Sequence, residues 1–372
     1  MNDATPLVDL EGVRAQVDAL LTAHLDALEG ELASAGSGTG PLIEAMRLML
    51  SGGKRLRAAF CYWSWRAHGG ARSGPEATVA LRVGAALELF QAAALFHDDV
   101  MDDSDTRRGL PAAHRSFAHT HRTAEWSGDD RRYGESAAIL LGDLALIASE
   151  REFAAAVADI DPVRAARTRA VFDRMRTEVT VGQYLDLQAQ VLPWGTDPVG
   201  DEQRAREVIR AKTARYSVEH PVLMGAALAG ADDDTLLAAS AFGLPLGEAF
   251  QLRDDLLGVF GDPSTTGKPA GDDLREGKRT VLVARAMAAA GRAGDLALME
   301  RLRAELGDPG LDEDACLDLA EAIRTSGAVD EVEQLIDLLV AEAERAWAIA
   351  PLTDPGREML AKLGRAAVQR QA

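Results

Sequence analysis

Aromatic residues are scarce in this chain of 372 residues: Phe, Trp and Tyr together make up 5% of the sequence. β-Branched residues are also sparse, whereas Ala and Leu dominate the apolar positions, and this composition disfavours sheet and favours helix. Hydrophobic residues still account for 47% of the chain, which is enough for a sizeable core. We therefore expect a mostly α-helical protein.

Cysteine is almost absent. Cys61 and Cys316 are far apart, and neither belongs to a CxxC pair or has a histidine companion. This pattern supports neither a disulfide framework nor a zinc site. We expect both thiols to be buried as small apolar side chains.

Long apolar runs are also missing. A membrane-spanning helix needs about 18 or more apolar residues, and Glu88 and Asp143 interrupt the most apolar segments. The N-terminal segment MNDATPLVDLEG lacks the basic start and apolar run of a signal peptide. We expect a cytoplasmic protein without a transmembrane segment.

Positive charge is in deficit, with 40 Lys and Arg against 59 Asp and Glu, so the formal net charge is −19. This field repels the phosphates of nucleic acids, and we expect no nucleic-acid partner. A small phosphorylated substrate would need metal ions and a local cluster of Lys and Arg.

The acidic residues are densest in residues 96–109, FHDDVMDDSDTRRG, where five aspartates in eight positions precede two arginines. On a helix, Asp98 and Asp102 share a face, with Asp99 beside them and Asp105 one further turn along. Such a face repels itself unless a cation neutralises it, and oxygen-only ligands suit Mg²⁺. Taken alone, the motif is equally typical of a solvated acidic helix end.

These aspartates end the longest apolar helix that the sequence predicts, over residues 76–101. Carboxylates are disfavoured at a helix C-terminus, so a bound metal would offset the local field. Upstream on this helix, residues 92–94 are all Ala, and Phe90 and Leu87 lie deeper. Small side chains below a metal site leave room for a long apolar chain, although close helix packing is the commoner reason for an Ala run.

A second pair of aspartates, Asp254 and Asp255, ends another apolar helix, predicted over residues 235–259 with a kink at Pro245. Two such helix ends are much less probable by chance than one. Lys268 and Lys278 follow this pair. Carboxylates, metal and lysines that converge on phosphate would stabilise a departing diphosphate.

A third motif, GGKRLR at residues 52–57, places three cations after a glycine pair and leads into a helix through residue 67. It is typical of a diphosphate site at a helix start, or of a helix cap with surface arginines. The GxxxxGK[ST] pattern of a P-loop is absent.

The rest of the chain also shows helical periodicity. Further helices are expected over residues 8–33, 42–50, 134–158, 162–187 and 222–229. After a turn at 194–201, another helix should carry Lys212 and Thr213 through to His220. Gly and Ser at 36–40 should end the first, and Pro41 suits the first turn of the next.

Two polar features have more than one interpretation. We expect residues 114–133 to form a solvated loop, rather than a zinc site, although His114, His119 and His121 lie there. Gln183 and Asp186 are either a local side-chain pair or an outer shell for metals.

Taken together, the motifs resemble those of the trans-isoprenyl diphosphate synthases, the polyprenyl synthetase family, over residues 40 to 350. They occur in this order: GGKRLR at 52–57, DDVMD with trailing RRG at 98–109, GQYLDL at 182–187, KT at 212–213, FQLRDD at 250–255, and GK pairs ending at Lys268 and Lys278. The resemblance implies an all-α fold, a single large helical bundle around a central cavity whose mouth carries both aspartate motifs. An N-terminal helix, 1–35, would join the catalytic domain, 36–372, in one fold, and a homodimer is expected.

The resemblance also implies roles for individual residues. Three Mg²⁺ ions would be held by Asp98, Asp99, Asp102, Asp254 and Asp255. The allylic diphosphate would contact Arg107, Lys212 and Lys268, with Lys278 a further substrate-binding cation. Isopentenyl diphosphate would contact Lys54, Arg57, Arg108 and Gln91, which stands where many bacterial relatives carry His. The catalytic positions near the developing cation would be Lys212, through its carbonyl, Thr213 and Gln251.

The implied reaction condenses isopentenyl diphosphate with an allylic diphosphate: the allylic C–O bond ionises, the isopentenyl double bond attacks and a proton is lost. One position departs from the family pattern. The second motif reads DDLLG, so Gly258 stands where the family commonly has a third Asp. The missing carboxylate would weaken one metal site or leave it completed by water.

Product length is a separate inference. Ala93 and Ala94 stand where farnesyl diphosphate synthases usually carry bulky aromatics. Phe90 is the first bulky residue, about 12 Å from Asp98 along the axis of a helix. This depth predicts geranylgeranyl diphosphate, with a farnesyl or longer-chain product as the alternative. A terpene cyclase would lack a use for GGKRLR, and a non-catalytic subunit of a heteromeric synthase is a further alternative.

Overall fold

The structure is a computed structural model, and it describes residues 7–261, 271–308 and 310–369. Helices make up most of it. Within those residues the strands are β1 (Thr106–Arg107) and β2 (Leu110–Pro111), which pair antiparallel with Thr106 opposite Pro111. The predicted all-α class is confirmed.

The chain divides into two compact units. The first contains residues up to 169, 221–233 and 351–363, and the second contains 170–220, 234–350 and those from 364 onward. The GGKRLR loop and the first aspartate motif belong to the first unit, whereas the KT segment and the second aspartate motif belong to the second. A catalytic domain over 36–372 stays a prediction.

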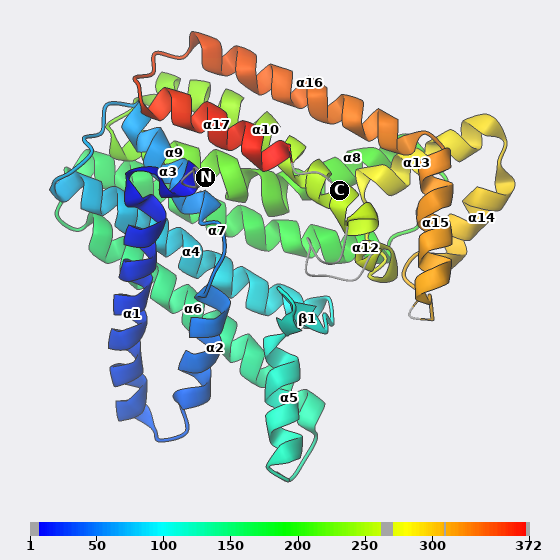
Figure 1. Cartoon of the computed structure of the whole chain (residues 1–372), viewed down its shortest axis with the longest axis horizontal. Coiled ribbons are helices and arrows are strands. Elements are labelled where there is room, and N and C mark those ends of the chain that lie inside the picture. Colours follow the sequence, from blue (N-terminus) through cyan, green and yellow to red (C-terminus); the bar gives the residue numbers. More distant parts are fainter. Residues whose placement is uncertain (1–6, 262–270, 309, 370–372) are drawn as a thin grey trace, which may run out of the picture. The chain divides into compact units, whose positions relative to one another are not determined.

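The first unit begins with the 3₁₀ segment η1 (Leu7–Gly12) and α1 (Val13–Ala35). The expected start near residue 8 is wrong, because Glu11 and Gly12 have φ of 58° and 70°, and left-handed residues interrupt a helix. Helix α2 (Gly40–Leu50) begins with Pro41 in its first turn, as predicted. It packs alongside α1 (Figure 1).

Helix α3 (Leu56–Ala67) is buried on nearly every side. Helix α9 (His220–Leu228) approaches it closely: a Cβ on Gly225 would lie 2.1 Å from the carbonyl oxygen of Cys61. The Ser64 hydroxyl donates to the carbonyl of Val222 at 2.6 Å. Cys61 is fully buried and Cys316 is 1% exposed, so the expectation of buried thiols is confirmed.

Helices α4 (Pro75–Met101) and α6 (Asp130–Val157) pack along their length (Figure 1). Gly142 of α6 leaves room for the ring of His97, because a Cβ at position 142 would lie 2.3 Å from Nε2 of that ring. The Ser149 hydroxyl donates to the carbonyl of Ala86 at 2.7 Å. Helix α4 therefore has a fixed position against its neighbour, up to the turn that carries the aspartates.

Helix α4 is long and apolar enough, by length and composition, to cross a membrane. Its most apolar window is 72% buried inside the protein. Burial of this kind is typical of a core helix.

The predicted loop at 114–133 is wrong over most of its length. Helix α5 (Ala113–Thr123) occupies its first half, and α6 begins at Asp130. His114, Phe117 and His121 recur at helical spacing and are buried on the face that packs against α6. The stretch has a polar composition because two of the four buried side chains of α5 are histidines, the others being Phe117 and Ala118.

The second unit consists mainly of helices joined by turns in its described residues. Helix α10 runs through Pro245. The segment between α8 and α9, where a helix was expected to carry Lys212 and Thr213 through to His220, is the π-helix η2. The elements that lie in or continue into this unit are α7 (Pro162–Val191), α8 (Pro198–Val208), η2 (Ile209–Glu219), α10 (Asp233–Phe260), α12 (Asp272–Arg275), α13 (Val281–Ala293), α14 (Leu296–Glu305), α15 (Glu313–Thr325), α16 (Ala328–Ile349) and α17 (Gly356–Val368).

Candidate active site

The first aspartate motif forms the last turn of α4. The amide of Asp102 donates to the carbonyl of Asp98 at 2.8 Å, so these residues stand one turn apart on one face, as predicted. Asp99 is fully buried, and the other two are partly exposed. Because α4 ends at Met101, the prediction that Asp105 continues the helix is wrong.

Arg107 lies against this motif. Its Nε donates to Oδ1 of Asp99 at 2.7 Å, and its Nη2 is 3.6 Å from Oδ2 of Asp98. Arg107 belongs to the β1–β2 hairpin, whose turn residues Arg108 and Gly109 have φ of 55° and 75°. Two left-handed residues are what a tight hairpin turn needs.

The other two aspartates of the stretch pair with arginines of neighbouring helices. Nη2 and Nε of Arg115 on α5 lie 3.0 Å and 2.9 Å from Asp103 and Asp105. Arg131 of α6 is 3.4 Å from Asp103. These carboxylates attach the segment after α4 to α5 and α6, a role that the sequence did not reveal.

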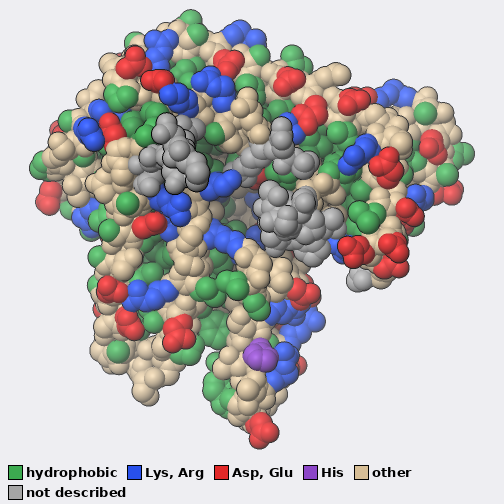
Figure 2. Space-filling view, in the orientation of Figure 1, with side chains coloured by type: hydrophobic (Ala, Val, Ile, Leu, Met, Phe, Trp, Pro, Cys, Tyr) green, Lys and Arg blue, Asp and Glu red, His purple; other side chains and the backbone are tan. Residues whose placement is uncertain are grey.

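The GGKRLR loop joins α2 to α3. Gly52 and Gly53 have φ of 71° and 82°, the left-handed region in which glycine carries no steric penalty. Lys54 is exposed and Arg57 is half-buried, whereas Arg55 is 5% exposed. Figure 2 shows Lys and Arg side chains gathered on the face that carries this loop.

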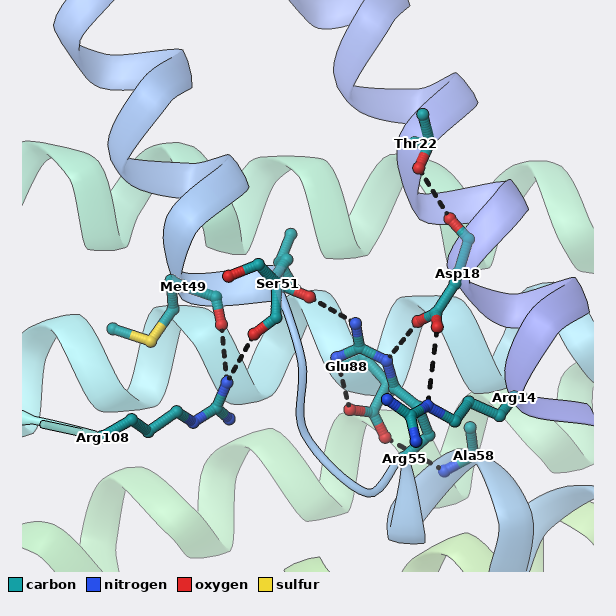
Figure 3. A network of polar contacts seen from close by, with 10 residues as sticks. Arg14, Asp18, Thr22, Met49, Ser51, Arg55, Ala58, Glu88 and Arg108 are labelled. Carbon is teal, nitrogen blue, oxygen red and sulfur yellow. Dashed lines mark hydrogen bonds and ion pairs between the residues drawn. The ribbon is translucent and has the colours of Figure 1, made fainter. Parts of the chain in front are cut away.

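Arg108 lies beside the loop. Its Nη1 donates to the carbonyls of Met49 and Ser51 at 2.9 Å and 3.3 Å (Figure 3). Burial and the nearby Arg55 guanidinium lower the pKa of Arg108. Clustered cations repel one another, so an anion bound among them would be favoured.

The residues expected to set product length lie on α4. Ala94 and Phe90 follow Asp98 upstream in steps of four residues, which keeps the three on one helix face. Ala94 is partly exposed and Phe90 is 4% exposed. Ala93 has no exposed surface, so it lies within the packed core. Gln91 is partly exposed.

In the second unit, η2 carries Lys212 and the partly exposed Thr213. The Lys212 ammonium donates to Oδ2 of Asp186 at 2.6 Å, a partner that neither interpretation of Asp186 included. A Cβ on Gly182 would lie 2.4 Å from the Lys212 amide, so glycine lets α7 approach η2. π-Helical segments often occur at functional sites.

The second aspartate motif lies near the end of α10. The side-chain amide of Gln251 donates from Nε2 to Oδ1 of Asp255 at 2.7 Å. Asp255 is 6% exposed, and its Oδ2 accepts no hydrogen bond from the part of the chain that the structure describes. Burial, followed by the negative charge of Asp273, raises the pKa of Asp255 to about 8. Asp254 is partly exposed.

Position 258 has no room for a side chain. A Cβ there would lie 2.0 Å from Oδ2 of Asp273, so this carboxylate occupies the space in which a third aspartate of the motif would begin. Lys278 lies 3.6 Å from Oδ1 of Asp273 and also pairs with Glu276. Sequence reasoning missed Asp273, and Lys268 lies outside the described residues.

No three His, Cys, Asp or Glu side chains among the described residues converge closely enough to hold a metal by themselves. Mg²⁺ commonly takes one or two carboxylates and completes its shell with water and substrate phosphate. The oxygen donors of both aspartate motifs, including the buried Oδ2 of Asp255, fit that ion.

The sequence model of the polyprenyl synthetase family matches residues 41–311. The chain belongs to this family. It is accordingly a prenyltransferase. α1 lies outside the matched region, and both aspartate motifs and the GGKRLR loop lie within it.

Family members with assigned products are similar over much of the chain. A geranylfarnesyl diphosphate synthase from Aeropyrum pernix is 31% identical over 86% of this chain and 90% of its own length. A geranylgeranyl diphosphate synthase from Sulfolobus acidocaldarius is 34% identical over 63% of each chain.

Among solved structures, a geranylgeranyl pyrophosphate synthase from Corynebacterium glutamicum is 38% identical, with a TM-score of 0.88 over 95% of this chain and 98% of that one. That structure holds isoprenyl diphosphate and magnesium.

Proposed function

We propose that this chain makes geranylgeranyl diphosphate by condensing isopentenyl diphosphate with an allylic diphosphate. The observation that carries the proposal is the last turn of α4, where Asp98 and Asp102 stand one turn apart beside Arg107. Carboxylates at a helix C-terminus oppose the helix dipole, so this arrangement favours a bound cation.

We propose that three Mg²⁺ bind with the allylic substrate, held by Asp98, Asp99, Asp102, Asp254 and Asp255. When bound, Mg²⁺ would neutralise the diphosphate and so favour breakage of the allylic C–O bond. The buried Oδ2 of Asp255 supports this assignment, because a buried carboxylate oxygen without a donor is costly.

The cations would divide between the two substrates. Lys54, Arg57 and Arg108, with Gln91, would bind isopentenyl diphosphate. Arg107, Lys212, Lys268 and Lys278 would bind the allylic diphosphate. The lowering of the pKa of Arg108 below its ordinary value, by desolvation and the Arg55 charge, supports an anion site at the GGKRLR loop.

The developing allylic cation would be stabilised by oxygen dipoles of the second unit. We assign this role to the Lys212 carbonyl, Thr213 and Gln251, and propose the released diphosphate as the proton acceptor. The π-helical geometry of η2 supports a role for its backbone, since such geometry is frequent at functional sites.

The twenty-carbon length rests on the face of α4 below Asp98. Ala94 is small and partly exposed there, and Phe90 is the first bulky side chain of the stripe. A longer product is the second candidate, because the Aeropyrum pernix relative is named for geranylfarnesyl diphosphate.

We also propose a homodimer in the cytoplasm. Helix α6 carries three exposed apolar residues: Ile139 is 41% exposed, Leu140 64% and Ile147 52%. An exposed apolar surface of this kind suits an interface between two copies of the chain. The two buried thiols are compatible with a reducing compartment.

A matched pair of variants tests the proposed metal ligands. Asp98→Asn should lower Mg²⁺-dependent turnover by about a thousandfold, as loss of a group that stabilises transition-state charge does. Asp103→Asn removes the same charge from the same stretch, at a residue that pairs with Arg115, and should stay within about threefold of wild type. Equal losses in both variants would contradict the assignment.

A further inference from the structure

Three successive carbonyls at the end of α2 are held by two arginines. Arg55 donates from Nη2 to the carbonyl of Leu50, and Arg108 donates to those of Met49 and Ser51 (Figure 3). The last carbonyls of a helix have no partner within it. These donors therefore fix the point at which the chain leaves α2 and enters the GGKRLR loop.

Arg55 is enclosed by the protein, with 4% of its side chain exposed. Its Nε donates to Oδ1 of Asp18 on α1 at 2.7 Å, and its Nη1 lies 3.5 Å from Oε2 of Glu88 on α4. A guanidinium in this position is shielded from a diphosphate in solvent. It nevertheless stands in the loop between Lys54 and Arg57, two proposed ligands of isopentenyl diphosphate.

Glu88 joins the same arginine to the start of α3. The carboxylate is 3% exposed, and its other oxygen, Oε1, accepts from the amide of Ala58 at 3.3 Å. Ala58 lies in the first turn of α3, where backbone N–H groups need acceptors from outside the helix. This contact explains why a charged residue interrupts the apolar sequence of α4.

Asp18 brings the N-terminal helix into this network. Arg14, one turn earlier on α1, lies 3.7 Å from Asp18, so the charges alternate from Arg14 through Asp18 and Arg55 to Glu88 (Figure 3). Helix α1 precedes the region that the polyprenyl synthetase sequence model matches. The carboxylate of Asp18, from outside the matched region, thus contacts the GGKRLR loop through Arg55.

We propose that Arg55 is a positioning residue which, held by Asp18 and Glu88, presents Lys54 and Arg57 to isopentenyl diphosphate, so that helix α1 sets the affinity for that substrate. Arg55 has a φ of 50°, so the chain turns in the left-handed region between the two ligands. Its partly exposed ion pair with Asp18 and its buried one with Glu88 offset the cost of that conformation. The inference rests on the proposed function, because it takes isopentenyl diphosphate as the ligand of this loop.

Asp18→Asn is the first test, with Asp26→Asn as the matched control. Asp26 lies on the same helix, its side chain is 62% exposed, and it pairs at 2.7 Å with Arg47 of α2 rather than with a residue of the loop. Asp18→Asn should raise KM for isopentenyl diphosphate by about three- to tenfold, the range for one partly exposed charged hydrogen bond. KM for the allylic substrate should stay within about twofold in both variants.

Two further variants separate charge from shape. Asp18→Glu keeps the charge and should recover part of the affinity. Arg55→Lys keeps a cation but lacks the planar fork that reaches three acceptors, so it should raise KM for isopentenyl diphosphate more than Asp18→Asn does. A loss of thermal stability with an unchanged KM would contradict a positioning role, as would equal rises in both KM values.

Hydrogen exchange without substrate gives a readout that does not depend on turnover. The amides of residues 50–58 should exchange faster in Asp18→Asn than in Asp26→Asn or wild type, and equal rates would overturn the proposal. If the wild-type chain makes no prenyl diphosphate, the proposed function fails, and the exchange rates then decide the positioning claim by themselves.

Discussion

Single residues in this chain acquire their roles from partners that are distant in sequence. Asp18 and Arg55 are 37 positions apart, yet they form a hydrogen bond. Gly258 and Asp273 are 15 positions apart, yet the Asp273 carboxylate occupies the space of a side chain at 258. Neither relation has a local pattern. The GGKRLR motif shows three equivalent cations, and only burial distinguishes Arg55 from its neighbours Lys54 and Arg57.

Restoring the third aspartate of the second motif should harm this protein. In Gly258→Asp the new side chain would meet the Asp273 carboxylate, because a Cβ at 258 lies 2.0 Å from its Oδ2. Overpacking of this kind costs about 1–3 kcal/mol of stability. Thermal unfolding would measure the loss of stability, and calorimetry of inorganic diphosphate with Mg²⁺ would measure the loss of diphosphate binding.

Gly258→Ala separates bulk from charge and should lose stability with a smaller loss of diphosphate binding. The exchanged pair Gly258→Asp with Asp273→Gly should recover part of both. Tighter Mg²⁺-dependent binding in Gly258→Asp alone would show that position 258 has room for a carboxylate.

The Cys61 thiol should resist alkylation in the native protein. Burial raises the pKa of Cys61 to about 12, so the reactive thiolate is scarce at every pH below that value, and the side chain has no exposed surface. Mass spectrometry after iodoacetamide treatment at pH 8 should find Cys61 unmodified in buffer and modified in guanidinium. Rapid modification in buffer would place the thiol at the surface.

At the scale of elements, apolar periodicity predicted the helices that carry the two aspartate motifs, because a buried helix repeats its apolar residues over many turns. α4 was expected over 76–101 and spans Pro75–Met101. α5 was missed, since its buried face consists of two histidines with Phe117 and Ala118 rather than of long aliphatic side chains. The π-helical form of η2 has no local sequence pattern that predicts it. It depends on glycines of other helices, such as Gly182 of α7, which leave room for its backbone.

The face of α4 below Asp98 should set product length through Ala94. Ala94→Phe places an aromatic ring four residues before Asp98 on the same stripe, and we expect it to shorten the product to fifteen carbons. Ala93 has no exposed surface, so Ala93→Phe should overpack the core and lower stability by about 1–3 kcal/mol. Product masses and unfolding temperatures would distinguish the two.

The outcome that contradicts this assignment is an Ala93→Phe protein of normal stability that makes a shorter product. It would mean that the growing prenyl product lies along the other face of α4. An unchanged twenty-carbon product in a folded Ala94→Phe protein would remove Ala94 from the set of length-determining residues.

At the scale of the whole molecule, the sequence predicted the helical class and the family, but not the division of contacts into two compact units. Each unit carries one aspartate motif and its own cations, in a chain whose net charge is −19. A surplus of negative charge disfavours anionic substrates in general. On the proposed function, local cation clusters and Mg²⁺ would offset this repulsion, and the measured rate should fall to background when the metal is removed.

The most direct test is the size of the product that the purified chain makes by itself. Wild-type protein supplied with isopentenyl diphosphate, farnesyl diphosphate and Mg²⁺ should release a product of twenty carbons, and a chelator should abolish its formation. A dominant product of thirty or more carbons, or none beyond farnesyl diphosphate, would contradict the proposed product length. No turnover without a second polypeptide would contradict the claim that this chain is a complete synthase.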